Sequence, residues 1–396
     1  MSRSIALPAP VCRLIDRLET EGFDCWIVGG CVRDSLLHKT PSDWDMTTAA
    51  TPEQMCAIFS DKRLMTNGEK HGTIGVIEDG QVYEITTYRV ETGCSDHRHP
   101  DSVHFTSRIE EDLSRRDFTI NAMAYHPQRG LLDCFGGEDD LRQRVVRCVG
   151  EPQLRFEEDA LRILRALRFA AALGFHIEPQ TLCAMRRKAA LLQEISAERI
   201  QSELCRTLCA PSAGKVLQLA PEVWSLLLDG LPDWQTHAPS LSCLPADAVL
   251  RLCWLYGCEG RSAAPLCRKL RFSAAQIRRA DAIFGCWRQL LDRREHLVFS
   301  LRKAMYRWGE AETEDTLTLL LQAQPQIPWQ QELMLARQGV WKLSQLAVDG
   351  QLLMQAGCPK GPMVGQVLGR LLELCIEERL DNRRDLLLQR ASELWR

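Results

Sequence analysis

The hydrophobic pattern of this 396-residue chain changes character near residue 150, and that change limits the folds it can adopt. Before it, short runs rich in β-branched and aromatic residues alternate with helical stretches: DCWIV (24–28), DWDMTT (43–48), TIGVIE (73–78) and VYEITTY (82–88). Asp79-Gly80, between the last two runs, predicts a hairpin. After residue 150, Leu-rich helical periodicity continues to the end, interrupted by prolines. The expected fold class is α+β, with a mixed-sheet head followed by an all-α remainder.

The length favours more than one domain. We expect a head over residues 1–145, a helical neck over 146–210, and a helical body and tail over 211–396. The composition, 45% hydrophobic and 26% charged, is typical of globular proteins. No signal peptide and no uncharged apolar run of about 18 residues is visible, so we expect a cytoplasmic protein without membrane association. The 17 cysteines form no C-x-x-C pair, which argues against zinc.

A Gly-Gly turn follows the first predicted strand, in the segment CWIVGGCVRD. Glycine permits close approach of a ligand to the backbone, and the amides at a helix start attract phosphate. Gly30 and, one turn later, Arg33 are therefore candidate phosphate contacts. Taken alone, this signal is weak, because such turns are common.

Two aspartates, Asp43 and Asp45, come shortly after this turn in SDWDM. Two residues apart on a strand, their side chains point to the same face, where two carboxylates repel unless a cation lies between them. Mg²⁺ accepts a few carboxylates together with phosphate oxygens. Glu84, on a neighbouring predicted strand, is either a third carboxylate or a surface residue.

The segment DLSRRDFTINAMA (112–124) combines basic residues with an apolar run. Asp117 is expected to cap a helix over residues 118–124. One of the two arginines, assigned here to Arg116, then faces a triphosphate.

The stretch FEEDALRILRALRF (156–169) predicts one helix with an unusual ridge. Asp159, Arg162, Arg165 and Arg168 recur at steps of three, whereas apolar residues occupy almost every other position around them. Solvated arginines on an amphipathic helix do not explain this enclosure, so we favour a binding role.

Together these motifs resemble the class II nucleotidyltransferases of the polymerase β superfamily, specifically the bacterial tRNA CCA-adding enzymes. Five pieces occur in the order of that family, over residues 20–205: GGCVRD, DWD, RRDFTINAMA, EEDALRILRALRF and ERI. The resemblance implies a polymerase β-like head, Mg²⁺ as cofactor, and tRNA, CTP and ATP as binding partners. No protein partner is implied.

The resemblance also implies a protein template on the predicted helix. Cytosine and adenine both present an amino donor beside a ring-nitrogen acceptor, whereas guanine and uracil present a carbonyl beside an N–H. Asp accepts and Arg donates, so Asp159 and Arg162 suit C and A and disfavour G and U. The matching arginines of the family contact the nucleotide, which implies the same for Arg165 and Arg168. Asp43 and Asp45 would hold two metal ions for phosphoryl transfer.

Two other features bear on this hypothesis. The loop 88–105, with Arg89, Glu91, Asp96 and Arg98, resembles the family's loop for switching from C to A addition, although Cys94 departs from its usual aromatic residue. Residues 261–307 hold twelve Lys and Arg against three acidic residues, a local balance of 12 − 3 = +9, which is either solvated helix surface or a phosphate-binding face. The alternatives are a bacterial poly(A) polymerase, a CC- or A-adding specialist, and a catalytically silent RNA-binding protein.

Overall fold

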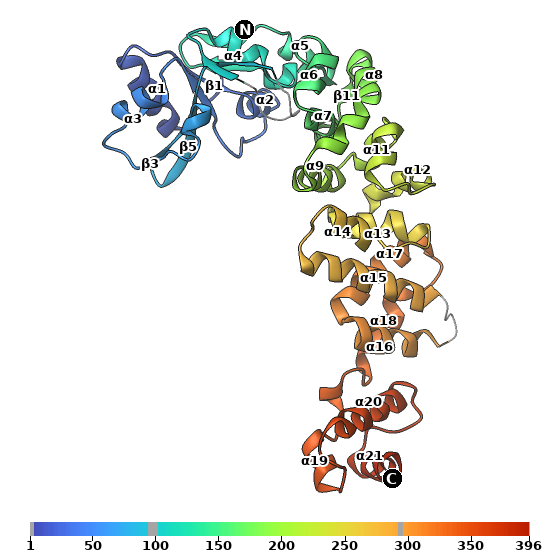
Figure 1. Ribbon diagram of the computed structural model, residues 1–396. Helices are drawn as coiled ribbons and strands as arrows, with labels where there is room; N and C mark the ends of the chain where they lie inside the picture. The colour runs from blue at the N-terminus through green and yellow to red at the C-terminus, as the bar shows by residue number, and fades with distance from the viewer. Residues whose placement is uncertain (1–3, 94–101, 292–295, 396) are drawn as a thin grey trace. The chain divides into compact units, whose positions relative to one another are not determined.

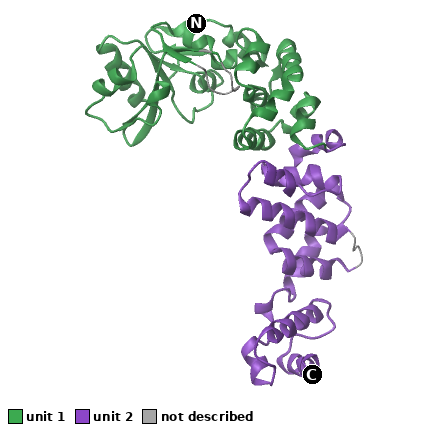
Figure 2. Ribbon diagram, in the orientation of Figure 1, with its two compact units in different colours: residues 1–230 green, residues 231–396 purple. Residues whose placement is uncertain are grey.

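The structure is a computed structural model that describes residues 4–93, 102–291 and 296–395. Its contacts divide the chain into two compact units, Met1–Gly230 and Leu231–Arg396 (Figure 2). Among the helices formed by the described residues, none combines the length and the low polarity that a bilayer span requires.

The first unit contains a seven-stranded mixed sheet with the strand order β3-β4-β5-β2-β1-β8-β9 (Figure 1). Its strands are β1 (Cys25–Val28), β2 (Met46–Thr48), β3 (Leu64–Met65), β4 (Thr73–Glu78), β5 (Gln81–Thr87), β8 (Met123–His126) and β9 (Gly130–Asp133). β4 and β5 form the expected hairpin, with Asp79 and Gly80 at positive φ. The remaining pairs are β6 (Arg89–Thr92) with β7 (Ser102–Phe105), and β10 (Val145–Val146) with β11 (His176–Ile177).

The two faces of the sheet differ in chemistry. On one face, a row of apolar residues crosses four strands through the registered positions Ile27, Met46, Ile85 and Ile74, all of them buried. Because side chains alternate along a strand, the next row points to the opposite face. That row contains Asp45 and Glu84, so the register itself brings acidic residues together.

Five helices accompany the sheet: α1 (Ala9–Thr20), α2 (Gly30–Leu36), α3 (Pro52–Ile58), α4 (Ile109–Ser114) and α5 (Gly137–Gln143). α4 inserts Ile109 and Leu113 into a cluster with Trp26, Val28 and Ala124, and thereby covers the β1–β8 part of the acidic face. The six helices that complete the unit are α6 (Pro152–Glu158), α7 (Leu161–Leu173), α8 (Pro179–Lys188), α9 (Ala197–Cys209), α10 (Ala213–Leu217) and α11 (Pro221–Leu227). α7 packs against α9.

The second unit is helical throughout its described residues, as the sequence predicted. Its helices are α12 (Trp234–His237), α13 (Ala248–Cys258), α14 (Ala264–Lys269), α15 (Ala274–Leu291), α16 (Leu297–Trp308), α17 (Glu310–Ala323), α18 (Trp329–Gln338), α19 (Gly350–Gln355), α20 (Pro362–Ile376) and α21 (Arg384–Leu394). The last three pack around Leu353, Leu371 and Leu387.

Three local expectations were wrong. β2 begins at Met46, so Asp43 and Asp45 lie in the segment just before the strand, although the amide of Val28 still donates to the Asp45 carbonyl at 3.0 Å. Residues 118–124 form a 3₁₀ turn (Thr119–Asn121) and the start of β8, because the apolar run pairs with β1 and β9.

The stretch 156–169 is also not one helix, because α6 ends at Glu158 and α7 begins at Leu161. Asp159 lies in the break with extended backbone angles, φ −144° and ψ 102°. Its Oδ1 accepts from the Leu161 amide at 3.1 Å, and its carbonyl accepts from the Arg162 amide at 3.0 Å. A short aspartate side chain competes in this way with the helical hydrogen bonds and ends the preceding helix.

Candidate active site

One cleft of about 540 Å³ in the first unit collects every residue that the sequence assigned to the metal and nucleotide sites. Its lining includes Gly30, Arg33, Asp43, Asp45, Arg116, Asp159, Arg162, Arg165 and Arg168. Segments as far apart in sequence as Gly29 and Arg206 therefore meet at one place. Eight arginines and five aspartates line the cleft, which gives a net charge of 8 − 5 = +3 when all are ionised. Such a field favours an anionic ligand.

The Gly-Gly turn forms the floor of the cleft at the start of α2. Gly29 adopts φ 77°, and a β-carbon placed there would lie 3.1 Å from Nη1 of Arg116. The turn thus leaves space that Arg116 fills. Arg33 is fixed by paired contacts of 2.9 Å to Asp34 and by donation to Asn121 Oδ1 at 2.7 Å.

Asp43 and Asp45 form the acidic end of the cleft. Asp43 accepts from the Ser42 hydroxyl at 3.2 Å, and neither carboxylate has an ion-pair partner among the residues that the structure describes. Partial desolvation, together with the nearby charges of Asp43 and Glu84, raises the pKa of Asp45 to about 6, although Arg116 acts in the opposite direction. An uncompensated carboxylate pair of this kind is a site for a cation.

The donor set is two carboxylates rather than a closed cage. Within the described ranges, no group of three His, Cys, Asp or Glu side chains is arranged to hold an ion. Glu84 is exposed and adjacent in register to Asp45, close enough to raise the pKa of that carboxyl. This set fits Mg²⁺, which takes one or two carboxylates and completes its shell with water and phosphate oxygens.

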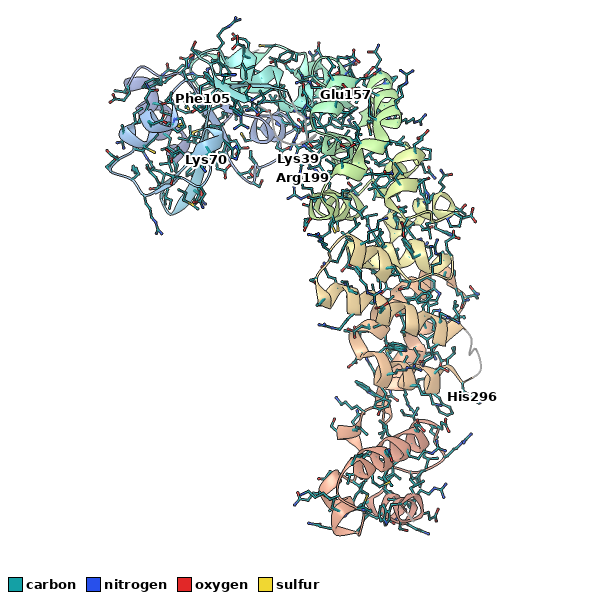
Figure 3. All side chains as sticks on the ribbon, in the orientation of Figure 1. Lys39, Lys70, Phe105, Glu157, Arg199 and His296 are labelled. Carbon is teal, nitrogen blue, oxygen red and sulfur yellow. The ribbon has the colours of Figure 1, made fainter. Side chains whose placement is uncertain are left out.

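Asp159 reaches the cleft from the break between α6 and α7. Nη2 of Arg199, from α9, holds its carboxylate at 2.9 and 3.2 Å, while Nη1 of the same guanidinium is buried without a partner. Figure 3 labels Arg199 on α9 and Glu157 on α6. Arg199 was not among the residues predicted from the sequence, although it lies inside the ERI motif.

Arg162 is held by acceptors on three sides. It pairs with Glu158 at 2.6 Å and donates to the carbonyl oxygens of Arg155 at 3.1 Å and Arg115 at 3.0 Å. Its side chain is 12% exposed. Asp159 and Arg162 therefore both line the cleft, and the charged group of each forms an ion pair with another residue of the protein.

The other two arginines of α7 are similarly paired. Arg165 binds Asp117 at 2.6 Å, and Arg168 binds Glu203 at 2.6 Å. Burial alone would raise the pKa of Asp117, but Arg165 and Asn121 outweigh burial and hold it below its usual range. Asp117 is thus an anchor for Arg165 rather than the helix cap that we expected.

Phe169 gathers guanidinium groups around its ring. Arg168, Arg33 and Arg165 lie 4.0, 5.1 and 5.5 Å from the ring centroid. These contacts orient arginines from two elements toward one wall of the cleft. Residues lining the cleft that the sequence analysis did not assign to it include Asp34, Ser42, Phe169, Arg199 and Arg206.

The 88–105 segment forms the β6–β7 hairpin, whose connecting residues, including Cys94, Asp96 and Arg98, lie outside the described residues. Arg89 and Glu91 contact each other at 2.9 Å, and Arg115 binds Glu91 at 3.0 Å. These ion pairs anchor the hairpin to the segment that carries Arg116.

The basic segment 261–307 contains both paired and unpaired cations. Arg279 bridges Asp247 and Asp315, each at 2.7 Å, so it serves the packing of α13, α15 and α17. Arg288 and Arg307 instead line a cleft of about 880 Å³ with Tyr306 and Trp308. Tyr306 is exposed and Trp308 is partly buried, and cations beside accessible aromatic rings suit RNA.

Comparisons with protein families assign most of the chain. Residues 25–147 match the "Poly A polymerase head domain", residues 174–223 the "Probable RNA and SrmB- binding site of polymerase A", and residues 246–391 the "tRNA nucleotidyltransferase domain 2".

Individual relatives match over almost their whole length. The CCA-adding enzyme of Limosilactobacillus fermentum is 34% identical, with 98% of both chains covered, and that of Geobacillus stearothermophilus is 32% identical, with 94% and 93% covered. The crystal structure of the Bacillus stearothermophilus CCA-adding enzyme in complex with CTP superposes with a TM-score of 0.80, at 30% identity and 98% coverage of both chains. The Thermotoga maritima enzyme complexed with tRNA shares the fold, with a TM-score of 0.70 at 18% identity, over 99% of this chain and 98% of that one.

Proposed function

Because the chain belongs to the class II CCA-adding enzymes, we propose that its cleft binds CTP or ATP and joins the nucleotide to the 3′ end of a tRNA. The enzyme is a nucleotidyltransferase that adds C, C and A without a nucleic-acid template and releases pyrophosphate. We assign residues 1–145 to the catalytic head, 146–210 to the neck, and 211–396 to a body and tail that bind tRNA. Since tRNA is its substrate, we place the enzyme in the cytoplasm.

Asp43 and Asp45 are the proposed catalytic carboxylates and would hold Mg²⁺. When bound, the ion neutralises phosphate charge and lowers the pKa of the attacking hydroxyl. The supporting observation is the unpaired acidic end of a cleft that is otherwise lined by arginines. Asp45 must be ionised for this role, and with a pKa of about 6 it is largely ionised at neutral pH.

Gly30, Arg33 and Arg116 are the proposed triphosphate contacts. Arg116 lies against the bare turn at Gly29, and its Nε is buried without a partner, so one donor remains for a ligand. Arg33 is held rigidly by Asp34 and Asn121, which reduces the entropy lost when it binds an anion. Both guanidiniums lie beside the carboxylates, where the phosphates must approach the metal.

Asp159 and Arg162 are the proposed base-reading pair. In the structure, Arg199 pairs with the Asp159 carboxylate and Glu158 pairs with Arg162. A cytosine or adenine edge supplies a donor for Asp159 and an acceptor for Arg162, so binding exchanges one set of partners for another. With guanine or uracil, the Asp159 carboxylate would face a carbonyl oxygen and the Arg162 guanidinium would face an N–H group. Neither pair can form a hydrogen bond, and buried polar groups without a partner are costly. Arg165 and Arg168 complete the nucleotide-facing wall.

The single observation that carries this proposal is the convergence of two carboxylates, two phosphate-facing arginines and an Asp–Arg pair on one cleft. The test is to incubate the enzyme with a tRNA that ends at the nucleotide before CCA, in the presence of CTP and ATP, and to sequence the products. We expect addition that stops at CCA. Long A tails, or no addition, would contradict the proposal.

A further inference from the structure

The catalytic row of the sheet continues past its acidic residues. The pair Met46–Ile85 is the first printed between β2 and β5, and one residue earlier the same register places Glu84 beside Asp45. Glu84 pairs with Gly75, and Gly75 pairs with Met65 at the edge. Neighbouring strands lie about 4.8 Å apart, so Gly75 is about 10 Å from Asp45 along the row. Val82 lies on the same face, two residues before Glu84. Since β2 and β5 run parallel, the step from Glu84 to Val82 has the direction of the step from Asp45 to Asp43.

This end of the face presents apolar side chains to solvent. Met65 is 45% and Val82 50% exposed, values that are high for large apolar residues on a sheet. Gly75 lies between them, since a β-carbon at Gly75 would be 3.1 Å from Val82 Cγ1 and 3.2 Å from Met65 Cβ. Together Met65, Gly75 and Val82 form a low apolar surface, called here the shelf. Exposed Arg63, whose carbonyl accepts from the Ile77 amide, lies two residues before Met65.

The reaction geometry determines what must lie there. The cleft with Gly30, Arg33 and Arg116 holds the triphosphate on one side of the carboxylates. In an in-line displacement the attacking oxygen arrives opposite the leaving pyrophosphate. The RNA end must therefore approach from the other side of Asp45, where the row leads through Glu84 to the shelf.

We propose that the shelf seats the 3′-terminal nucleotides of the tRNA, and that Met65 and Val82 hold the nucleotides that precede the last one, so that the terminal hydroxyl reaches Asp45; this inference rests on the proposed function. The distance of about 10 Å from Asp45 corresponds to two or three stacked nucleotides at about 3.4 Å each. Apolar side chains contact ribose and base edges whatever the sequence. Such contacts suit this site because the terminal nucleotide of the tRNA changes with every addition. Arg63 supplies a cation for a phosphate at the far side.

Gly75 is buried beneath Met65 and Val82, and its missing side chain lets these two residues lie close together on the face. A side chain at position 75 would push Met65 and Val82 apart and so disrupt the shelf. The shelf is continuous with the catalytic row, and this continuity favours an RNA end over an unrelated protein partner or a second copy of the chain.

The test compares the double variant Met65→Ala/Val82→Ala with a matched control, Leu154→Ala. Leu154 is 55% exposed on α6 and does not line the cleft. We measure KM for tRNA, KM for CTP and kcat at saturating concentrations of both. Because a stacked base contributes enough to change affinity several-fold to a hundredfold, the double variant should raise KM for tRNA about tenfold. KM for CTP and the thermal midpoint should stay near those of the control.

A second measurement does not depend on a variant. A tRNA with 4-thiouridine as its last nucleotide before CCA is irradiated in the complex, and the crosslinked peptide is identified by mass spectrometry. Crosslinks to β3 or β5 support the shelf. If wild type adds CCA but the double variant matches Leu154→Ala and crosslinks fall elsewhere, the shelf is wrong. If the double variant instead changes the sedimentation coefficient with KM for tRNA unaltered, the face is a dimer contact. If wild type adds no CCA, the proposed function itself fails.

Discussion

Replacing Arg162 with alanine should relax nucleotide discrimination more than it destabilises the protein. The side chain lines the cleft, and its removal deletes the donor that we propose faces the ring nitrogen of C or A. Each unmatched polar group in such a site costs about 1–3 kcal/mol. Preference for CTP and ATP over UTP and GTP should therefore fall about tenfold to a hundredfold, at 1.4 kcal/mol per factor of ten. Asp159 remains, so some rejection of a carbonyl should persist.

Arg162 also binds Glu158 and two carbonyl oxygens, so part of the change could come from lost stability. A control variant must measure that part. Arg155→Ala removes another partner of Glu158 on the same helix pair without touching the cleft lining. It should lower the thermal midpoint to a similar extent while leaving nucleotide preference unchanged. Any loss of preference for CTP and ATP that Arg162→Ala shows and Arg155→Ala does not is then due to base reading.

The assay is single-turnover incorporation of each of the four nucleotides onto a tRNA lacking CCA and onto one ending in CC. The reasoning is refuted if Arg162→Ala slows all four nucleotides by one common factor and keeps the preference for C and A. Arg162 would then act on phosphate or on the fold, and the edge of the base would be read elsewhere.

Three further outcomes follow from the same geometry. Asp43→Ala or Asp45→Ala should abolish transfer while tRNA affinity, measured by filter binding, changes little; normal turnover at saturating Mg²⁺ would remove the metal assignment. Because the pKa of Asp45 is raised to about 6, kcat/KM at subsaturating Mg²⁺ should fall about tenfold per unit as pH drops below 6, and Glu84→Gln should move that midpoint to lower pH; an unmoved midpoint would dissociate Glu84 from the site. Arg278→Glu and Arg288→Glu should each weaken tRNA binding and reduce the log–log salt slope by roughly 0.7–0.9 per lost phosphate contact, and an unchanged slope would assign them to ordinary helix surface.

Much of the fold was readable because local patterns agreed with the final packing. The hairpin at Asp79-Gly80 formed where predicted, since both residues accept positive φ. The 118–124 segment failed for the opposite reason. Its apolar run suits a helix in isolation, but β1 and β9 offer it two pairing edges, and no local signal reports distant partners.

The site shows the same division. Motif order sufficed to predict residues such as Asp45 and Arg116, which the fold brings into one cleft. Asp159 was placed inside a helix because helical periodicity hides a single break, although aspartate is a favoured residue at helix starts. Arg199 and the pairing of Arg279 were not predictable, because both depend on carboxylates that are distant in the sequence.

The central claim is that protein side chains read the pairing edge of the incoming base, and a modified nucleotide tests it most directly. A CTP analogue that lacks only the exocyclic amino group offers no base donor to the Asp159 carboxylate, while the rest of the ligand is unchanged. We predict that wild type prefers CTP over this analogue by at least about tenfold in kcat/KM, and that Asp159→Ala reduces the preference toward unity. An equal preference in wild type and Asp159→Ala would contradict the account.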